Sequence, residues 1–232
     1  MAVDRWSDTP RATAGLGSSD AVVSTFMASV YRWMAGGLAV TGLVAVYLFA
    51  NPQIVAAIFG STFGMIALVV VQLGMVMAFS AMQQRASFGV LAAMFLAYCA
   101  TVGVTFGAVL LVYTGASVAS TFFITGGTFL AMSAYGTLTK KSLDSWGSFL
   151  MMGLVGLVIA SIVNLFLHSG ALSFVLSCVG VVVFTGLTAY DTQKIRAMAG
   201  TDGRFALSGA LRLYLDFVNL FLSIINLTGK RR

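Results

Sequence analysis

Seven apolar segments, separated by short polar connections, occupy most of the 232-residue chain. An apolar run of about 18 or more residues is a candidate membrane helix, because about twenty residues at 1.5 Å each span a hydrocarbon core of about 30 Å. Only 9% of the residues are charged, whereas about a quarter are charged in a typical soluble domain. The sequence therefore predicts an all-α integral membrane protein, with segments at 29–50, 62–82, 88–113, 116–138, 146–167, 171–193 and 210–228.

The predicted domain organisation has two parts. Residues 21–232 are expected to form one seven-helix transmembrane domain, in which very short connections such as "YTGA" (113–116) make consecutive helices antiparallel neighbours. Residues 1–20 contain no apolar core, so they are expected to be a flexible N-terminal tail and not a cleaved signal peptide. Gly103 and Gly107 have the spacing that lets membrane helices approach closely, although a helix that merely tolerates glycine has the same pattern.

Basic residues are distributed unequally between the two sides of the predicted bundle. With seven crossings, ten of the thirteen Lys and Arg residues lie on the side of the N-terminus, which predicts a cytoplasmic N-terminus. The C-terminal Lys230, Arg231 and Arg232 lie on the other side if the last helix crosses, and on the same side if that helix turns back; crossing is preferred. The ten residues are Arg5, Arg11, Arg32, Arg85, Lys140, Lys141, Lys194, Arg196, Arg204 and Arg212.

The last apolar segment carries a polar face. Five polar residues follow one another at spacings of four, three, four and three, which keeps them on one side of a helix. Polar groups on a membrane helix find no partners in lipid, so this face should point into the protein or line a water-filled path. The alternative is that these side chains only hydrogen-bond neighbouring helices. The five are Arg212, Asp216, Asn219, Ser223 and Asn226.

Two aspartates are expected to meet near the cytoplasmic ends of the last two helices. Asp191 lies close to the end of one helix and Asp216 lies about six residues into the next, which is about 9 Å at 1.5 Å per residue. Thr188 shares the face of Asp191 and is a candidate hydrogen-bond donor to it. Two carboxylates in contact at low dielectric cannot both ionise cheaply, so they would share one proton. When deprotonated they would form a weak oxygen site for Ca²⁺.

Other partners for these aspartates remain open. Asp216 is one turn from Arg212, and Asp191 is close to Lys194, so each acid has a cation nearby on its own helix. Arg85 is the one charged residue between Arg32 and Lys140. It is either a topology determinant in its connection or a cationic latch that reaches the aspartates and holds the bundle closed.

Enzymatic function is not expected from this sequence. We find no Ser–His–Asp, HExxH, P-loop or cysteine-rich signature, and the single histidine, His168, lies in a short connection. Cys99 and Cys178 lie inside apolar segments and are expected to be buried thiols. No tightly bound cofactor is implied, and a partner of nucleic acid type is not expected because the net charge of +6 is explained by membrane topology.

The chain resembles the Bax inhibitor (TMBIM) family in its bacterial branch. The resemblance covers nearly everything after residue 20, and the stretches that carry it include "YDTQKIR" (190–196) and "LYLDFVNLFLSIIN" (213–226). Two further stretches, "VYRWMAGGLAVTGLVA" and "SAYGTLTKKSLDSWGSFLMMGLVGLVIASIVNLFL", start at residues 30 and 133. The resemblance implies seven helices with the last one surrounded by the other six, and a location in the bacterial inner membrane.

The resemblance also implies a function, a pH-sensitive Ca²⁺ leak controlled by a paired-aspartate sensor. By motif, this sensor would be Asp191 and Asp216. An arginine near the end of the second helix latches the closed state in the family, and Arg85 is the candidate. A glutamate expected in that helix in some members is absent here, with Gln72 the nearest polar group. The alternative function is a regulatory protein that binds a membrane-bound quality-control protease through the N-terminal tail.

Overall fold

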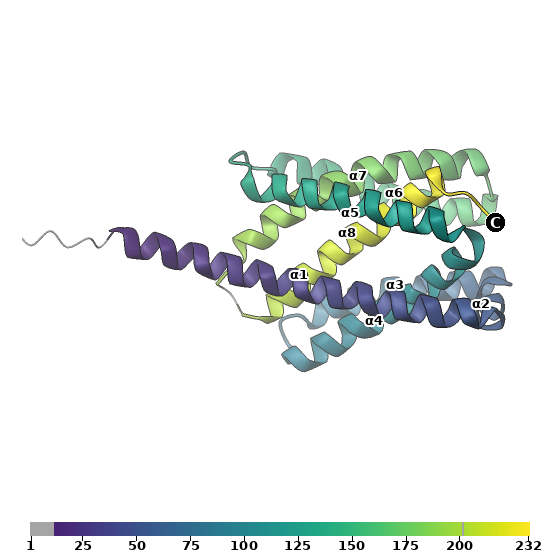
Figure 1. Cartoon of the computed structure of the whole chain (residues 1–232), viewed down its shortest axis with the longest axis horizontal. Helices are drawn as coiled ribbons and strands as arrows, with labels where there is room; N and C mark the ends of the chain where they lie inside the picture. Colours follow the sequence, from purple (N-terminus) through teal and green to yellow (C-terminus); the bar gives the residue numbers. More distant parts are fainter. Residues whose placement is uncertain (1–11, 201) are drawn as a thin grey trace, which may run out of the picture.

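The computed structural model describes the backbone of residues 12–200 and 202–232, and the side chains from Asp20 onward. Within this part of the chain there are eight helices (Figure 1). They are α1 (Ala12–Ala50), α2 (Pro52–Phe59), α3 (Thr62–Met82), α4 (Phe88–Val112), α5 (Gly115–Leu138), α6 (Asp144–Leu167), α7 (Gly170–Ala197) and α8 (Arg204–Thr228).

Seven of these helices are long and apolar enough to cross a membrane. They correspond to the seven predicted segments, so the predicted fold is confirmed. Helix α2 was not predicted as a separate element; it starts at Pro52, which suits the first turn of a helix because proline lacks an amide hydrogen. Helix α1 begins at Ala12, inside the segment expected as a tail, whereas residues 1–11 lie outside the described residues.

Helix α8 lies at the centre of the bundle, as predicted. It packs against α1, α4, α5 and α7 and passes diagonally between them in Figure 1. In its apolar span 67% of the residues are buried, against 6% for α3 and 11% for α6. The last helix is therefore the most buried of the seven long helices, and α3 and α6 form the outer layer of the bundle.

The seam between α1 and α4 depends on two glycines. A Cβ atom added at Gly103 would lie 2.6 Å from Cβ of Val44, and one added at Gly107 would lie 2.8 Å from Cβ of Leu48. Both distances are far below an ordinary van der Waals contact, so only glycine lets the two backbones approach this closely. The close-approach interpretation of this spacing is therefore confirmed.

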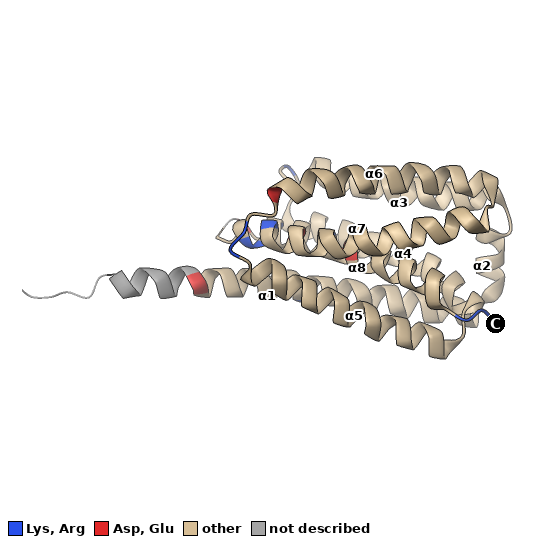
Figure 2. Cartoon of the chain, turned by 90° about the horizontal axis from the view of Figure 1, so that it is seen from above, with Lys and Arg blue, Asp and Glu red and all other residues tan. Residues whose placement is uncertain are grey.

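The bundle has two distinct ends. Connections 83–87 and 139–143, together with residues 198–200 and 202–203 between α7 and α8, lie at the end from which α1 projects (Figure 1). We call this the N-terminal end. The chain finishes at the opposite end, where Thr114 donates its backbone N–H to the carbonyl of Lys230 and Arg232 donates its own to Val112. Helix α8 thus runs the length of the bundle. This length favours the prediction that the last helix crosses the membrane, and not the alternative that it turns back. Figure 2 shows basic residues at both ends.

Candidate functional site

The register between α7 and α8 determines which polar side chains face one another. At one point Gly180 of α7 packs against Ser223, and further along Ile195 packs against Gly209. Because the two helices are antiparallel, residue numbers of facing positions sum to nearly the same value. This register places Arg212 opposite Asp191, and Asp216 about one turn deeper along the same interface.

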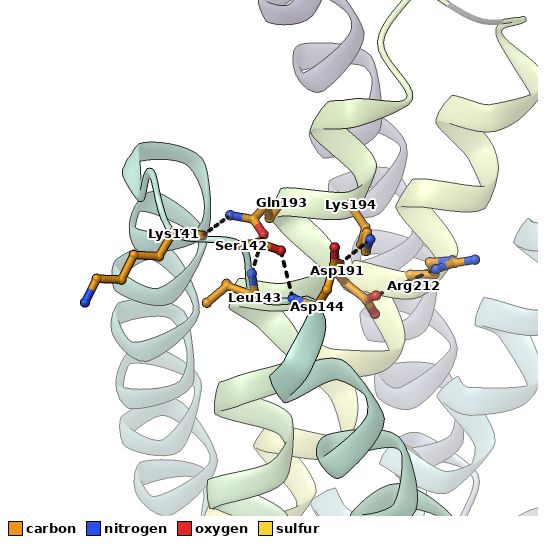
Figure 3. Close-up of polar contacts among 8 residues, drawn as sticks. All are labelled: Lys141, Ser142, Leu143, Asp144, Asp191, Gln193, Lys194 and Arg212. Atoms are coloured by element: carbon orange, nitrogen blue, oxygen red, sulfur yellow. Dashed lines mark hydrogen bonds and ion pairs between the residues drawn. The ribbon is translucent and has the colours of Figure 1, made fainter.

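Asp191 forms an ion pair with Arg212 across this interface (Figure 3). Nη1 of Arg212 lies 3.7 Å from Oδ1 of Asp191, and the two side chains are 46% and 14% exposed. The sequence suggested Arg212 as a partner of Asp216 and Lys194 as a neighbour of Asp191. In the structure Asp191 instead forms its ion pair with Arg212, and Lys194 forms one with Asp144 at the start of α6.

Asp216 is buried, with only 4% of its surface exposed. Its Oδ2 atom makes no hydrogen bond within the described part of the chain. The charges of Asp191 and Arg212 both act on this carboxyl group, so the two aspartates belong to one electrostatic cluster. A buried polar atom without a partner is costly unless a proton, a water or an ion satisfies it. Thr125 and Thr185 also have a buried hydroxyl oxygen without a partner, but among the described residues Asp216 is the one buried acid.

Thr188 does not serve as a donor to Asp191. Its hydroxyl group donates to the backbone carbonyl of Phe184, one turn earlier on the same helix, at 2.7 Å. This bond to the helix's own backbone is common for threonine in membrane helices. The suggested hydrogen bond from Thr188 is therefore absent from this structure.

The remaining members of the polar face of α8 make hydrogen bonds inside the bundle. Asn219 donates to the carbonyl of Leu215 and Ser223 donates to that of Asn219, each at 2.8 Å. Asn226 accepts a hydrogen bond from the hydroxyl of Tyr113 at 2.9 Å. The bonds of Asn219 and Ser223 stay within α8 itself, and only that of Asn226 leaves the helix, as the alternative of hydrogen bonds to the neighbouring helices expects. The lining of a pore by Arg212, Asn219, Ser223 and Asn226 stays a prediction.

The segment after Asp191 connects the site to the α5–α6 connection (Figure 3). Gln193 accepts a hydrogen bond from the backbone N–H of Leu143 at 2.9 Å and donates one to the carbonyl of Lys141 at 3.0 Å. The next residue, Lys194, pairs with Asp144. The last turns of α7 therefore hold both α8, through Asp191, and the start of α6. Sequence analysis did not assign this role to Gln193.

A second polar contact connects α7 to α5 and α1. Thr192 lies 3.1 Å from the hydroxyl of Ser133, and Ser133 is hydrogen-bonded to Tyr31 of α1. Further along, Arg196 donates to the carbonyl of Thr137 at 2.5 Å. Within "YDTQKIR", successive side chains thus contact different helices, so a displacement of this segment would affect most of the N-terminal end.

Arg85 does not reach the aspartates in this structure. It is exposed in the α3–α4 connection, and within the described residues its side chain has no ion pair with Asp191 or Asp216. The cation at the carboxylates is Arg212, because α8 passes directly along α7 whereas α3 packs on the far side of α4. An exposed position in a connection fits the alternative role of topology determinant.

The two carboxylates provide few ligands for a metal ion. Within the described residues there is no group of three or more His, Cys, Asp or Glu side chains that could hold one. Ca²⁺ takes six to eight oxygen ligands, and two carboxylates supply at most four. Asp191 and Asp216 could therefore hold an ion only weakly, with several water molecules kept on the ion. The Oδ2 atom of Asp216, which has no hydrogen-bond partner among the described residues, is available as a ligand to such an ion.

Comparison with known proteins gives matches along nearly the whole chain. The model of a family described as "Inhibitor of apoptosis-promoting Bax1" matches residues 23–232. "Inner membrane protein YbhL" of Escherichia coli strain K12 is 43% identical over 218 residues, covering 90% of this chain and 93% of that protein. An uncharacterized protein of Deinococcus radiodurans is 44% identical over 215 residues, covering 90% and 92%. Another, of Caulobacter vibrioides, is 39% identical over 231 residues, covering 93% and 92%.

Proposed function

Because the chain belongs to the Bax inhibitor family over residues 23–232, we propose that it is a pH-sensitive calcium leak channel. Protonation of the pair Asp191 and Asp216 controls the leak. The observation that carries this proposal is the buried carboxyl of Asp216, whose Oδ2 atom has no hydrogen bond among the described residues, next to the ion pair of Asp191 with Arg212. No catalytic group takes part in this function.

Protonation acts on the balance of charge between α7 and α8. With Asp216 neutral, Asp191 and Arg212 are one anion and one cation, an arrangement that a low-dielectric interface tolerates. When Asp216 releases its proton to water, two carboxylates face a single guanidinium, and their mutual repulsion is poorly screened. That excess negative charge attracts Ca²⁺ and pushes the two helices apart. Protons and Ca²⁺ compete for the same oxygens, so Ca²⁺ affinity rises with pH.

Reconstitution in liposomes tests the proposal. Asp216→Asn and Asp191→Asn should each reduce Ca²⁺ flux and flatten its dependence on pH, because an amide neither titrates in this range nor supplies a carboxylate. Asp20→Asn is the matched control, since Asp20 is an exposed acid on α1, away from the pair. Flux and pH dependence that survive unchanged in both pair variants would show that these aspartates do not control a leak.

The proposal includes an orientation in a bacterial inner membrane with the N-terminus in the cytoplasm. The E. coli relative is an inner membrane protein by its printed name, and the N-terminal end of the bundle carries the larger number of basic residues. In a cysteine-free background (Cys99→Ala, Cys178→Ala), a cysteine placed at Lys230 should react with an impermeant maleimide in intact cells. A cysteine placed at Lys140 should react only after permeabilisation; the reverse pattern would invert the orientation.

An alternative is a regulatory role, in which the chain binds a membrane-bound quality-control protease. The projection of α1 beyond the rest of the bundle favours this alternative, because it offers a helix that other proteins can reach (Figure 1). Residues 1–11 of the expected handle lie outside the described residues. If the regulatory role is correct, deletion of residues 2–19 should abolish protease regulation and preserve Ca²⁺ flux. If the chain is only a leak channel, the same deletion is not expected to change protease regulation.

A further inference from the structure

A shallow groove of about 520 Å³ lies on the outer surface between α6 and α7. Its lining consists of Gly147, Ser148, Met151, Met152 and Val155 from α6, and Tyr190 from α7. The ring of Tyr190 rests against the backbone of Gly147, where an added Cβ atom would overlap the ring. The floor of the groove is therefore an aromatic ring seated on a glycine, and its sides are flexible methionines and a small serine.

The groove lies at the level where the bilayer changes from headgroups to acyl chains. Helix α6 has 24 residues, about 36 Å at 1.5 Å per residue, so it is longer than a hydrocarbon core of about 30 Å. Trp146 in its first turn is 62% exposed, and exposed tryptophans gather at the membrane–water interface. From Gly147 to Val155 the groove then descends about 12 Å into the hydrocarbon region.

The mouth of the groove is positively charged. The ammonium group of Lys194 lies 5.7 Å from the centre of the Tyr190 ring and pairs with Asp144 (Figure 3). Lys140 and Lys141 are exposed in the adjoining α5–α6 connection. The end of α7, the α5–α6 connection and the first residue of α6 thus contribute three cations and one carboxylate to this end of the groove. This positive balance favours an anionic occupant.

We propose that this groove binds one anionic phospholipid. The phosphate lies beside Lys194, and an acyl chain runs along Met151, Met152 and Val155, whose flexible or compact side chains adapt to it. A lipid fits better than a partner helix, because the groove is shallow and only about 12 Å long, a fraction of the length of a membrane-spanning helix. The proposal is independent of the calcium leak, since it uses neither Asp191 nor Asp216.

Native mass spectrometry tests the site on the full chain released from bilayers of equal parts phosphatidylglycerol and phosphatidylcholine. The wild-type protein should retain one phosphatidylglycerol in preference to phosphatidylcholine. Ser148→Trp fills the groove and should reduce this retention about tenfold, equivalent to about 1.4 kcal/mol. Ser161→Trp is the matched control, because Ser161 is also exposed on α6 but does not line the groove, and its retention should equal the wild type.

Two variants that change charge without filling the groove should shift phosphatidylglycerol retention in opposite directions. Lys194→Met removes the cation at the mouth and should weaken phosphatidylglycerol retention, whereas Asp144→Asn frees that cation and should strengthen it. Both variants break the same ion pair. If the loss of that pair acted only on the structure, phosphatidylglycerol retention would change in the same direction in both variants. The same direction of change in both, or equal retention of the two lipids by the wild type, would overturn the proposal even if Ser148→Trp fails to fold.

Discussion

At the scale of single residues, the partner of Asp191 determines how the site responds to protons. Arg212 lies 3.7 Å from Asp191, and its positive charge favours the ionised carboxylate. The Arg212 side chain is 46% exposed, so water screens this attraction to well below the about 4 kcal/mol that applies at 4 Å for an effective dielectric of 20. Asp216 has no comparable contact in the described part of the chain. The two acids therefore have different environments although they share one interface.

Removal of this cation should change the pH response. In Arg212→Gln, Asp191 loses the charge that favours its ionised form, so a higher pH should be needed to reach the same Ca²⁺ flux in liposomes. Arg231→Gln is the control, because Arg231 is exposed at the opposite end of the bundle. An unchanged flux-against-pH curve in Arg212→Gln would remove Arg212 from the proposed mechanism.

At the scale of elements, an aspartate just outside α8 stabilises its first turn. Arg204 donates its backbone N–H to Oδ1 of Asp202 at 3.0 Å and its Nε–H to Oδ2 at 2.8 Å. These contacts, first the backbone bond and then the side-chain bond, hold the pKa of Asp202 below its ordinary value. Arg204 also donates to the carbonyl of Gln84 at 3.1 Å, so this turn is joined to the α3–α4 connection.

The sign of the resulting pH dependence follows from the lowered pKa. Stabilisation by Asp202 is fully present above the pKa of the unfolded chain and is lost as the pH falls through the lower pKa of the folded protein. Asp202→Asn should therefore lower the midpoint of thermal unfolding slightly at pH 7, and the difference from wild type should disappear in strong acid. If the difference is the same at both pH values, the charge of Asp202 contributes nothing to stability.

The C-terminal end of α8 is joined to the α4–α5 turn mainly by backbone hydrogen bonds. Lys230 accepts from Thr114 at 3.0 Å and donates to the hydroxyl oxygen of Ser117 at 3.0 Å, and Arg232 donates to Val112 at 2.9 Å. Side chains add a hydrogen bond from Arg232 to the carbonyl of Tyr113 and a contact of Arg232 with the ring of Phe49. This arrangement closes the far end of the central helix.

Deletion of residues 230–232 should therefore open the α4–α5 turn. The amide of Thr114 should exchange its hydrogen faster, because its acceptor is removed, and the thermal midpoint should fall. The control is a triple alanine variant at Lys230, Arg231 and Arg232, which keeps the backbone bonds and removes only the side chains. If the Thr114 amide exchanges as fast in the alanine variant as in the deletion, the side chains and not the backbone hydrogen bonds join the end of α8 to the α4–α5 turn.

At the scale of the whole molecule, helix packing depends on a few sites of close backbone approach. Gly103→Ala should lower the thermal midpoint in detergent, because the new Cβ atom would lie 2.6 Å from Val44 and force α1 and α4 apart. Gly127→Ala is the control, since an added Cβ atom at Gly127 would meet nothing within 4 Å. There the higher helix propensity of alanine should be neutral or stabilising. Equal effects at both positions would contradict a role for close packing.

Prediction from sequence was successful where the signal is local. Hydropathy located the seven spans with most ends within four residues, although α1 is longer than predicted and α8 begins at Arg204 and not at 210. The polar spacing on 212–226 predicted that one face of α8 points into the protein, and the family resemblance implied its central position. Helix α2 was missed because eight residues are too short for a spanning signal. Gln193 was missed because a single polar residue near a helix end has no pattern that distinguishes it from an exposed one.

The sequence by itself determined that this chain has seven helices long and apolar enough to cross a membrane, and that each of the last two carries one acid in its apolar span. These properties depend on apolar length and helical period, which each segment carries alone. Only the tertiary structure decided that Arg212 pairs with Asp191, that Lys194 pairs with Asp144, and that Arg85 lies apart from the carboxylates. The physical reason is that pairing depends on the register and spacing between helices, which side chains far apart in the chain set together.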